Sequence, residues 1–413
     1  MIVLKFGGTS IKNKDAIKNI PSIVKSRGNG QLVVVSALRG VTDLLISLAE
    51  KLKLNLNSDI YNEVADFHNV HLELVSSIDL DSSIASELKK SLIDLIEAII
   101  QIGHLSENSF NRLLLQGELA SSIILNKFLE KHGIESKIVE IDDLLEFENS
   151  SYRLINEISS NRITITQGFF AKKENEIINL GRGGSDLSAS IFGSLLNAQE
   201  IQIWTDVDGL MSADPRIVKD ARVIDKISFE NMNDMARYGA KVLHPDTIKP
   251  AIKSNIPVRI LNTFSPENSG TLIINELEEN DIRAVVLKQD LLLCKVKNSS
   301  DLNTIEKLSY EINKLSKFNL NVFEFFGNDN SFEALIDDEI NLELIDLFSE
   351  AEFEQSNVIC IIGKNPTKFL RILKTLPGNF NFNYNTSNNS TILIIPPGDQ
   401  KKLLSLIHEI ISS

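Results

Sequence analysis

Near its N-terminus the chain reads IVLKFGGTS (residues 2–10), an apolar run followed at once by two glycines and two hydroxyl residues. Such a run fits a short buried strand, and Gly7 and Gly8 let the backbone after it approach a ligand closely. Backbone N–H groups at the start of a following helix favour phosphate, and the Lys5 ammonium could reach phosphate oxygens. A P-loop has its lysine after the glycines, so this is not one. The same residues also fit a plain glycine turn capped by Thr9.

The first two thirds of the chain alternate short apolar runs with longer stretches whose apolar residues recur every three or four positions. This alternation predicts an α/β domain on a largely parallel sheet covered by amphipathic helices. Pro21 should start or kink a helix, because it lacks an N–H. The clearest strands are residues 2–6, 32–36, 162–166, 201–205 and 257–261, and the clearest helices are residues 84–102 and 108–131.

The last third begins after an acidic stretch at residues 275–281 and has a different pattern. The order strand, helix, strand, strand, helix occurs twice, which predicts two small α+β units with antiparallel sheets that either fold separately or interleave. We therefore expect domains at residues 1–280, 281–350 and 351–413. The predicted strands are 291–296, 321–326, 331–336, 358–362, 379–384 and 391–395, and the predicted helices are 302–317, 342–349, 367–376 and 400–411.

The composition of the 413 residues is that of a folded globular protein, with 43% hydrophobic and 24% charged residues. A net charge of −14 opposes nonspecific attraction to nucleic acid or anionic membranes. Cys294 and Cys360 lack the spacing of a zinc or redox motif, so we expect two buried thiols in a reducing compartment. Residues 1–10 do not read as a secretory signal, and no apolar run is long enough to span a bilayer. We expect a cytoplasmic protein that binds neither nucleic acid nor membrane.

A second glycine-rich loop reads LGRGGSD at residues 180–186 and lies between a predicted strand and a predicted helix. Arg182 offers a planar, bidentate donor to a carboxylate or phosphate, and Asp186 could orient a lysine or a magnesium ion. A tight turn in which Ser185 or Asp186 caps the helix explains the same residues without a ligand.

A third candidate reads WTDVDG at residues 204–209, at the end of a strand, and DPR follows at residues 214–216. Ligands of open α/β sheets bind beyond the carboxyl ends of the strands, so Thr205 and Asp206 could hold a nucleotide and Arg216 a phosphate. An ordinary turn is the alternative. A calcium loop is excluded, because the required spacing of acidic residues is absent.

Single polar residues give weaker signals. The hydroxyls of Ser36 and Thr42 could hydrogen-bond a small acid, and Glu118 could bind its ammonium group, although each residue alone fits a structural role better. Lys241 lies in GAKVLHP (residues 239–245), and a lone lysine is usually a surface residue. The six histidines show no ligand spacing, so we assign them no metal.

Four motifs in this order and spacing closely resemble those of the aspartokinases, which are members of the amino acid kinase family. They are KFGGTS at 5–10, GRGGSD at 181–186, WTDV at 204–207 and GAKVLHP at 239–245. The resemblance covers residues 1–274, and beyond it the paired units look like the family's ACT regulatory domains in outline. It implies an α/β, amino acid kinase-like three-layer sandwich with a largely parallel central sheet, followed by two small α+β, ferredoxin-like units.

The resemblance also implies an activity. This is the ATP-dependent phosphorylation of the side-chain carboxylate of L-aspartate to 4-phospho-L-aspartate, the first step towards amino acids such as lysine and threonine. Mg²⁺ would be bound mainly through the nucleotide, and an amino acid could act as an effector on the C-terminal units. No general base is needed, because the attacking carboxylate is already ionised and cations around the moving phosphoryl group stabilise the transition state. Edge strands of small sheets commonly pair across a homodimer or a higher homo-oligomer.

Carried onto this sequence, the resemblance gives Lys5, Asp186 and Lys241 the catalytic roles, with both lysines on the ATP phosphates and Asp186 organising them. Arg182 would hold the α-carboxylate of the substrate, and Glu118 its α-ammonium group. The rest of the acid pocket would comprise Ser36, Thr42, Phe169, Gly183 and Ser185. The ATP site would comprise Lys5, Gly7, Gly8, Thr9, Thr205, Asp206, Met211, Arg216 and Lys241.

Some positions depart from the family pattern. Met211 stands where a tyrosine often packs against adenine, so ring stacking would be either weaker or replaced by a sulfur contact. Leu187 replaces a residue that is commonly polar or aromatic. Residues 297–300 lack the glycine that the family often has in its effector loop, so the resemblance leaves feedback control by lysine or threonine open.

Two other functions remain open. A related kinase could act on glutamate or another small acid, because pocket depth decides between acceptors that differ by one methylene group. A noncatalytic sensor could bind a ligand in its C-terminal units and keep a vestigial kinase domain. The intact Lys5, Arg182, Asp186 and Lys241 favour an active enzyme.

Overall fold

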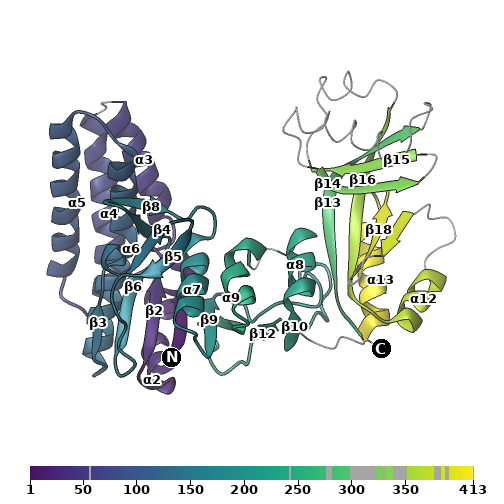
Figure 1. Cartoon of the computed structure of the whole chain (residues 1–413), viewed down its shortest axis with the longest axis horizontal. Coiled ribbons are helices and arrows are strands. Elements are labelled where there is room, and N and C mark those ends of the chain that lie inside the picture. The colour runs from purple at the N-terminus through teal and green to yellow at the C-terminus, as the bar shows by residue number, and fades with distance from the viewer. Residues whose placement is uncertain are drawn as a thin grey trace. The chain divides into compact units, whose positions relative to one another are not determined.

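The computed structural model describes residues 1–54, 57–240, 243–275, 281–297, 322–328, 331–337, 351–375, 383–386 and 390–412. The chain forms two compact units whose segments alternate along the sequence (Figure 1). Unit 1 comprises Met1–Leu210, Asp225–Phe229 and Val242–Glu276, and unit 2 comprises Met211–Ile224, Glu230–Lys241 and Leu277–Ser413.

Unit 1 is built on a sheet in which eight strands are described, in the order β10-β12-β11-β9-β1-β2-β6-β3. Every neighbouring pair is parallel except β11 and β12. The central strands are almost continuous runs of buried apolar residues, as expected of a parallel sheet that is covered on both faces. The strands are β1 (Ile2–Phe6), β2 (Gln31–Val35), β3 (Ser136–Ile138), β6 (Ile163–Gln167), β9 (Glu200–Thr205), β10 (Lys226–Ser228), β11 (Val258–Asn262) and β12 (Thr271–Ile274).

Two helices of unit 1, α6 (Glu107–Lys131) and α7 (Gly184–Leu195), pack against strands of this sheet. The helices α3, α4 and α5 stand beside α6 (Figure 1). A smaller sheet has the order β5-β4-β7-β8. The remaining elements are α1 (Lys14–Ile17), α2 (Ile20–Ser26), α3 (Val41–Lys53), α4 (Asn57–Ser77), α5 (Ser83–Ile102), α9 (Lys249–Lys253), β4 (Leu145–Glu148), β5 (Ser151–Leu154), β7 (Phe170–Lys173), β8 (Glu176–Asn179) and the 3₁₀ turns η1 (Gly8–Ser10), η2 (Ile141–Asp143) and η3 (Pro245–Ile248).

Unit 2 contains one antiparallel sheet with the described order β14-β15-β13-β16-β18-β17. Its longest strands, β13 and β16, pair with each other, and α13 packs against both (Figure 1). The elements are β13 (Ile282–Lys297), β14 (Val322–Asn328), β15 (Ser331–Ile336), β16 (Ala351–Gly363), β17 (Asn383–Thr386), β18 (Ser390–Ile395), α12 (Pro366–Thr375) and α13 (Gln400–Ser412), while α8 (Phe229–Arg237) begins in unit 1 and continues in unit 2.

The segment Met211–Ile224 belongs to unit 2 because its apolar residues enter the core of that unit. Ala213 and Val218 pack in one cluster with residues of β13, β16 and α13. The backbone N–H of Val285 donates to the Ser212 carbonyl at 2.8 Å, and the Ser212 hydroxyl lies 2.8 Å from Nε2 of His408. This segment is therefore tied to both β13 and α13.

The predicted α/β domain with a largely parallel sheet is confirmed. The C-terminal strands are antiparallel as predicted, but the described strands form one sheet instead of two, because β13 pairs with β16. Pro21 lies in the first turn of α2, and both cysteines are buried, as expected. Among the described residues, no helix has the length and the apolar character that a bilayer span needs.

Two features of the sheets differ from the sequence-based prediction. The strand predicted to start at residue 291 starts at Ile282, because a bulge near Asp290, where φ is +60°, carries polar residues that interrupt the apolar run. The four-stranded sheet of unit 1 was not predicted, because its strands are short and partly polar. The predicted helices 302–317 and 342–349 lie outside the described residues, and the domain boundaries at 280 and 350 stay predictions.

Candidate active site

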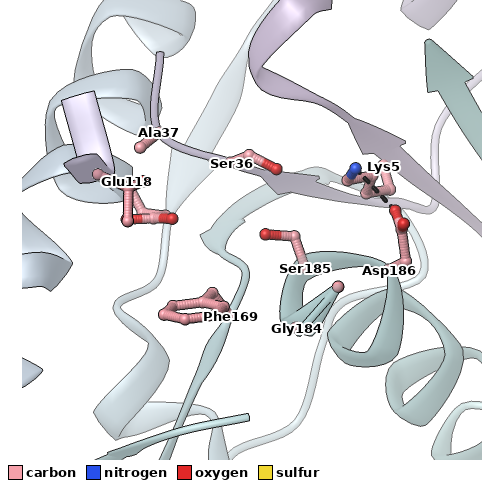
Figure 2. Close-up of a pocket in the computed structure, with 10 residues that line it drawn as sticks. Lys5, Ser36, Ala37, Glu118, Phe169, Gly184, Ser185 and Asp186 are labelled. Carbon is pink, nitrogen blue, oxygen red and sulfur yellow. Dashed lines mark ion pairs between the residues drawn. The ribbon is translucent and has the colours of Figure 1, made fainter. Parts of the chain in front are cut away.

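A pocket of about 220 Å³ opens in unit 1, beside the carboxyl ends of β1 and β2 (Figure 2). Its walls come from the end of β1, the segment from β2 into α3, the middle of α6, the turn between β6 and β7, and the start of α7. Parallel strands bring such distant segments to one edge of a sheet, which is the usual place for a ligand in this class of fold. The lining residues are Lys5, Ser36, Ala37, Thr42, Glu118, Phe169, Gly183, Gly184, Ser185 and Asp186.

One side of the pocket carries an ion pair. Nζ of Lys5 in β1 lies 2.7 Å from Oδ1 of Asp186 in the first turn of α7, and the two side chains are only 11% and 18% exposed (Figure 2). A carboxylate in the first turn of a helix is stabilised by the helix dipole, which supports Asp186 at this place. The pair fixes the lysine ammonium at the pocket wall.

The glycines after β1 let two loops approach closely. A Cβ atom at Gly8 would lie 2.5 Å from the carbonyl oxygen of Ala37, and one at Gly7 would lie 3.3 Å from Nζ of Lys5. Ser10 then anchors the turn, because its hydroxyl donates to the Trp204 carbonyl at 3.0 Å. The KFGGTS segment is therefore a fixed loop that runs beside the lysine ammonium.

Glu118 supplies a buried carboxyl group on the side of the pocket away from Lys5 (Figure 2). It lies in the middle of α6, which comes close at Gly117, where a Cβ atom would be 2.8 Å from Cβ of Ala37. Burial raises the pKa of Glu118 from 4.5 to about 8, and hydrogen bonding from the Ala37 backbone offsets only part of this rise. Its Oε2 atom has no hydrogen-bond partner among the described residues. Such an acceptor suits a cationic ligand.

The structure brings eight of the sequence-predicted site residues into one pocket: Lys5, Ser36, Thr42, Glu118, Phe169, Gly183, Ser185 and Asp186. Arg182 directly precedes Gly183 but is exposed and does not line the pocket. Among the residues that the structure describes, none forms a hydrogen bond or an ion pair with its guanidinium.

The predicted nucleotide residues fall into different parts of the chain. Gly7, Gly8 and Thr9 form the turn after β1. Thr205 ends β9 and Asp206 follows it, and the Thr205 hydroxyl donates to Asp206 at 3.3 Å. In unit 2, Met211 pairs with Val223 in an isolated bridge, and the exposed Arg216 forms an ion pair of 2.7 Å with Asp214. Lys241 lies outside the described residues.

Sequence reasoning missed Ala37 and Gly184 as lining residues, because small side chains carry no chemical signal of their own. It also missed the anchoring role of Ser10, which pairs with Thr263, a residue 253 positions away along the chain, at 2.7 Å. In the described part of the chain, no three side chains of His, Cys, Asp or Glu gather in a way that could hold a metal ion.

Comparisons with known proteins agree with this arrangement. Residues 1–262 match the sequence model of the amino acid kinase family. Lysine-sensitive aspartokinase 3 of Escherichia coli (strain K12) is 27% identical over 99% of this chain and 98% of its own length. An aspartokinase of Chlamydia muridarum is 30% identical over 74% of this chain and 72% of its own length.

A solved structure extends the likeness to the whole fold. The crystal structure of E. coli aspartokinase III in complex with aspartate and ADP shares 26% sequence identity with this chain. The alignment covers 100% of both chains with a TM-score of 0.75. Together with the match over residues 1–262 and the geometry of the pocket, these similarities show that the chain belongs to the aspartokinases of the amino acid kinase family.

Proposed function

We propose that this chain transfers the γ-phosphoryl group of ATP to the side-chain carboxylate of L-aspartate and that the reaction takes place in the pocket of unit 1. The observation that carries the proposal is one pocket with a lysine–aspartate pair at one side and a buried glutamate at the other. A cation beside the moving phosphoryl group and an acceptor for an ammonium group are what a kinase of an amino acid needs. The product would be 4-phospho-L-aspartate, the first intermediate towards lysine and threonine.

The amino acid would bind between Glu118 and Lys5. Glu118 is proposed to accept hydrogen bonds from the α-ammonium group, whose positive charge would bring the raised pKa of this carboxyl group back down. Arg182, at the rim, would swing onto the α-carboxylate, for which its planar fork is suited. The proposed remaining contacts to the acid come from Ser36, Thr42, Phe169, Gly183 and Ser185.

The phosphoryl group would be transferred next to Lys5. Its ammonium group is held by Asp186 at 2.7 Å, so it stabilises charge on the phosphoryl oxygens without first having to be ordered. The backbone of Gly7, Gly8 and Thr9 would surround the phosphates. The acceptor carboxylate is already ionised at neutral pH and can attack directly, so no side chain needs to remove a proton.

The rest of the nucleotide would be bound by Thr205, Asp206, Met211, Arg216 and Lys241. Mg²⁺ fits this site mainly as a partner of the phosphates, because Asp186, the carboxylate nearest to Lys5, is engaged in an ion pair. When bound, the metal would neutralise part of the charge on the transferred group. The chain's own residues would position ATP and the acid in line.

Unit 2 is proposed to regulate the enzyme and to assemble it. E. coli aspartokinase 3 is named as lysine-sensitive, so lysine is the first effector to test on this chain. The strands β14 and β17 lie at the two edges of the described sheet, and edge strands of this kind commonly pair across a homodimer. A cytoplasmic location and domain boundaries at 280 and 350 remain our predictions.

The proposal is tested by trapping the acyl phosphate with hydroxylamine in reactions that contain ATP and aspartate, glutamate or no acid. We expect aspartate-dependent hydroxamate, and a loss of at least about a hundredfold in Lys5→Ala, because one preorganised charge-stabilising group is removed. The matched control is Lys18→Ala, which removes an exposed lysine paired with Asp15 at 3.1 Å and should leave the rate unchanged. A signal that depends on glutamate alone would move the assignment to a glutamate kinase, and a signal independent of any acid would refute both. Lysine, threonine and methionine added to the same assay test the proposed regulation.

A further inference from the structure

Phe169 lines the pocket from an unusual backbone conformation. It lies between β6 and β7 with φ of +71°, in the left-handed region that residues with a side chain rarely adopt. Its ring lies on the side of the pocket away from the Lys5–Asp186 pair (Figure 2). Such a conformation persists only where the surrounding structure holds it in place.

Ser188 on α7 fixes the Phe169 backbone through a hydrogen bond. The N–H of Phe169 donates to Oγ of Ser188 at 2.9 Å, and the Ser188 hydroxyl donates to the Gly184 carbonyl at 3.0 Å. The hydroxyl proton is thereby used, which leaves a lone pair of Oγ for Phe169. Ser188 is 0% exposed, so water is not in a position to replace this acceptor. On the other side, the N–H of Leu180 donates to the Phe169 carbonyl at 2.8 Å.

The ring of Phe169 is confined as well. A Cβ atom at Gly184 would lie 2.4 Å from Cδ2 of the ring, so the ring rests directly on the backbone of the α7 N-terminus. The ring of Phe170 meets it edge-on, with centroids 4.9 Å apart and planes at 86°. The wall formed by Phe169 is therefore fixed in both its backbone and its side chain.

We propose that Ser188 is a positioning residue which, through Phe169, sets the length of the amino acid that the pocket accepts. The inference rests on the proposed function. The Phe169 ring and Glu118 bound one side of the pocket, and Lys5 bounds the other. An acid longer by one methylene, such as L-glutamate, would have to move either its ammonium group from Glu118 or its terminal carboxylate from the phosphoryl group beside Lys5. Because Phe169 is held rigidly, this wall of the pocket cannot move to make room for the longer acid.

The test compares kcat/KM for L-aspartate with kcat/KM for L-glutamate in the parent enzyme and in variants of α7. A fixed wall discriminates one methylene group by roughly 10- to 200-fold. Ser188→Ala should lower the aspartate-to-glutamate ratio about 2- to 10-fold, which is the factor that one hydrogen bond contributes. Ser188→Thr, which keeps the hydroxyl, should restore the parent ratio. The matched control is Ser190→Ala, because Ser190 is equally buried on the same helix but accepts its hydrogen bond from Ala251 at 3.0 Å, away from the pocket lining.

Phe169→Gly separates a positioning role from a merely structural one. Glycine adopts a positive φ without strain, so this variant should fold and show a lower ratio than Ser188→Ala does. In the Phe169→Gly background, Ser188→Ala should change the ratio no further, since the two residues act through one wall. An unchanged aspartate-to-glutamate ratio in folded Ser188→Ala would overturn the inference. If Ser188→Ala does not fold, an unchanged ratio in Phe169→Gly would overturn it. A ratio that is lower in the double variant than in Phe169→Gly would overturn it as well. A parent enzyme without aspartate-dependent product would overturn the proposed function, and with it this inference.

Discussion

Glu118 gives the reaction a pH dependence that follows from its burial. Glu118 is 3% exposed, and burial raises the pKa of its carboxyl group to about 8. Only the ionised form binds an ammonium group well. We therefore predict that kcat/KM for aspartate, which reports the free enzyme, follows the ionisation of Glu118. The perturbation that tests this is Glu118→Gln, which keeps the shape of the side chain and removes its charge.

The size of the effect follows from a pKa of about 8. The ionised fraction is then about 1% at pH 6, about 10% at pH 7 and about half at pH 8. The value of kcat/KM should therefore rise about tenfold from pH 6 to pH 7, rise about fivefold more to pH 8, and level off near pH 9. Glu118→Gln should lack this rise. At pH 8 its kcat/KM should be roughly 10- to 150-fold below that of the parent enzyme, because a hydrogen bond to a charged group contributes about this factor.

Titration of the same carboxyl group should change the stability of the protein in the direction opposite to the change in kcat/KM. Its pKa is higher in the folded protein than the ordinary value of 4.5, so between these two pH values the folded state holds a proton that the unfolded chain has released. Stability consequently falls as the pH rises through this window, by an amount on the order of a few kcal/mol. Glu118→Gln removes the titrating group, so the unliganded variant should be more stable than the parent at pH 8.

Two assays check these expectations. A coupled assay of ADP release gives kcat/KM between pH 6 and pH 9, and urea unfolding at pH 6 and pH 8 gives the stability. The matched control is Glu130→Gln on the same helix, where the glutamate is surface-exposed and its pKa is lowered, chiefly by hydrogen bonding from Lys127. A kcat/KM profile that is flat from pH 6 to pH 8, or one shared by the parent and Glu118→Gln, would refute the reasoning.

Three further changes probe other parts of the account. Arg182→Ala should raise the KM for aspartate about tenfold or more with the melting temperature unchanged, because an exposed cation is removed; an unchanged KM would remove Arg182 from the site. Gly8→Ala places a Cβ atom 2.5 Å from the Ala37 carbonyl and should destabilise the protein by about 1–3 kcal/mol in urea unfolding, so parent-like stability would mean that the two loops move apart easily. Leu404→Ala, in the core of unit 2, should lower the stability by about 2–5 kcal/mol, and a loss below about 1 kcal/mol would contradict the packing of α13.

Local sequence patterns predicted much of the fold and many of the residues of the pocket. The strand Ile2–Phe6 is the same in prediction and structure, because an apolar run before two glycines leaves little choice. The prediction that Lys5, Glu118 and Asp186 act together depended on the resemblance to a family, since they are far apart in sequence. Their convergence depends on backbone contacts such as that between Gly8 and Ala37, which no local pattern encodes.

The features that the sequence analysis did not predict depend on contacts between residues far apart in the chain. The left-handed backbone of Phe169 depends on an acceptor in another element, so its own sequence neighbours do not reveal it. The segment Met211–Ile224 looks like a loop of the kinase part of the sequence, yet its apolar residues pack into unit 2. Burial in three dimensions, rather than local propensity, sets such assignments.

The central claim is that a carboxylate oxygen of aspartate attacks the γ-phosphorus of ATP in the pocket beside Lys5. It is tested most directly with aspartate labelled with ¹⁸O in its side-chain carboxylate, with hydroxylamine present to cleave the acyl phosphate at its carbonyl carbon. The bridging oxygen then leaves with the phosphate. The account predicts phosphate that carries one ¹⁸O atom in the parent enzyme, and none formed above background in Lys5→Ala. Unlabelled phosphate from the parent would show that water, and not the amino acid, receives the phosphoryl group.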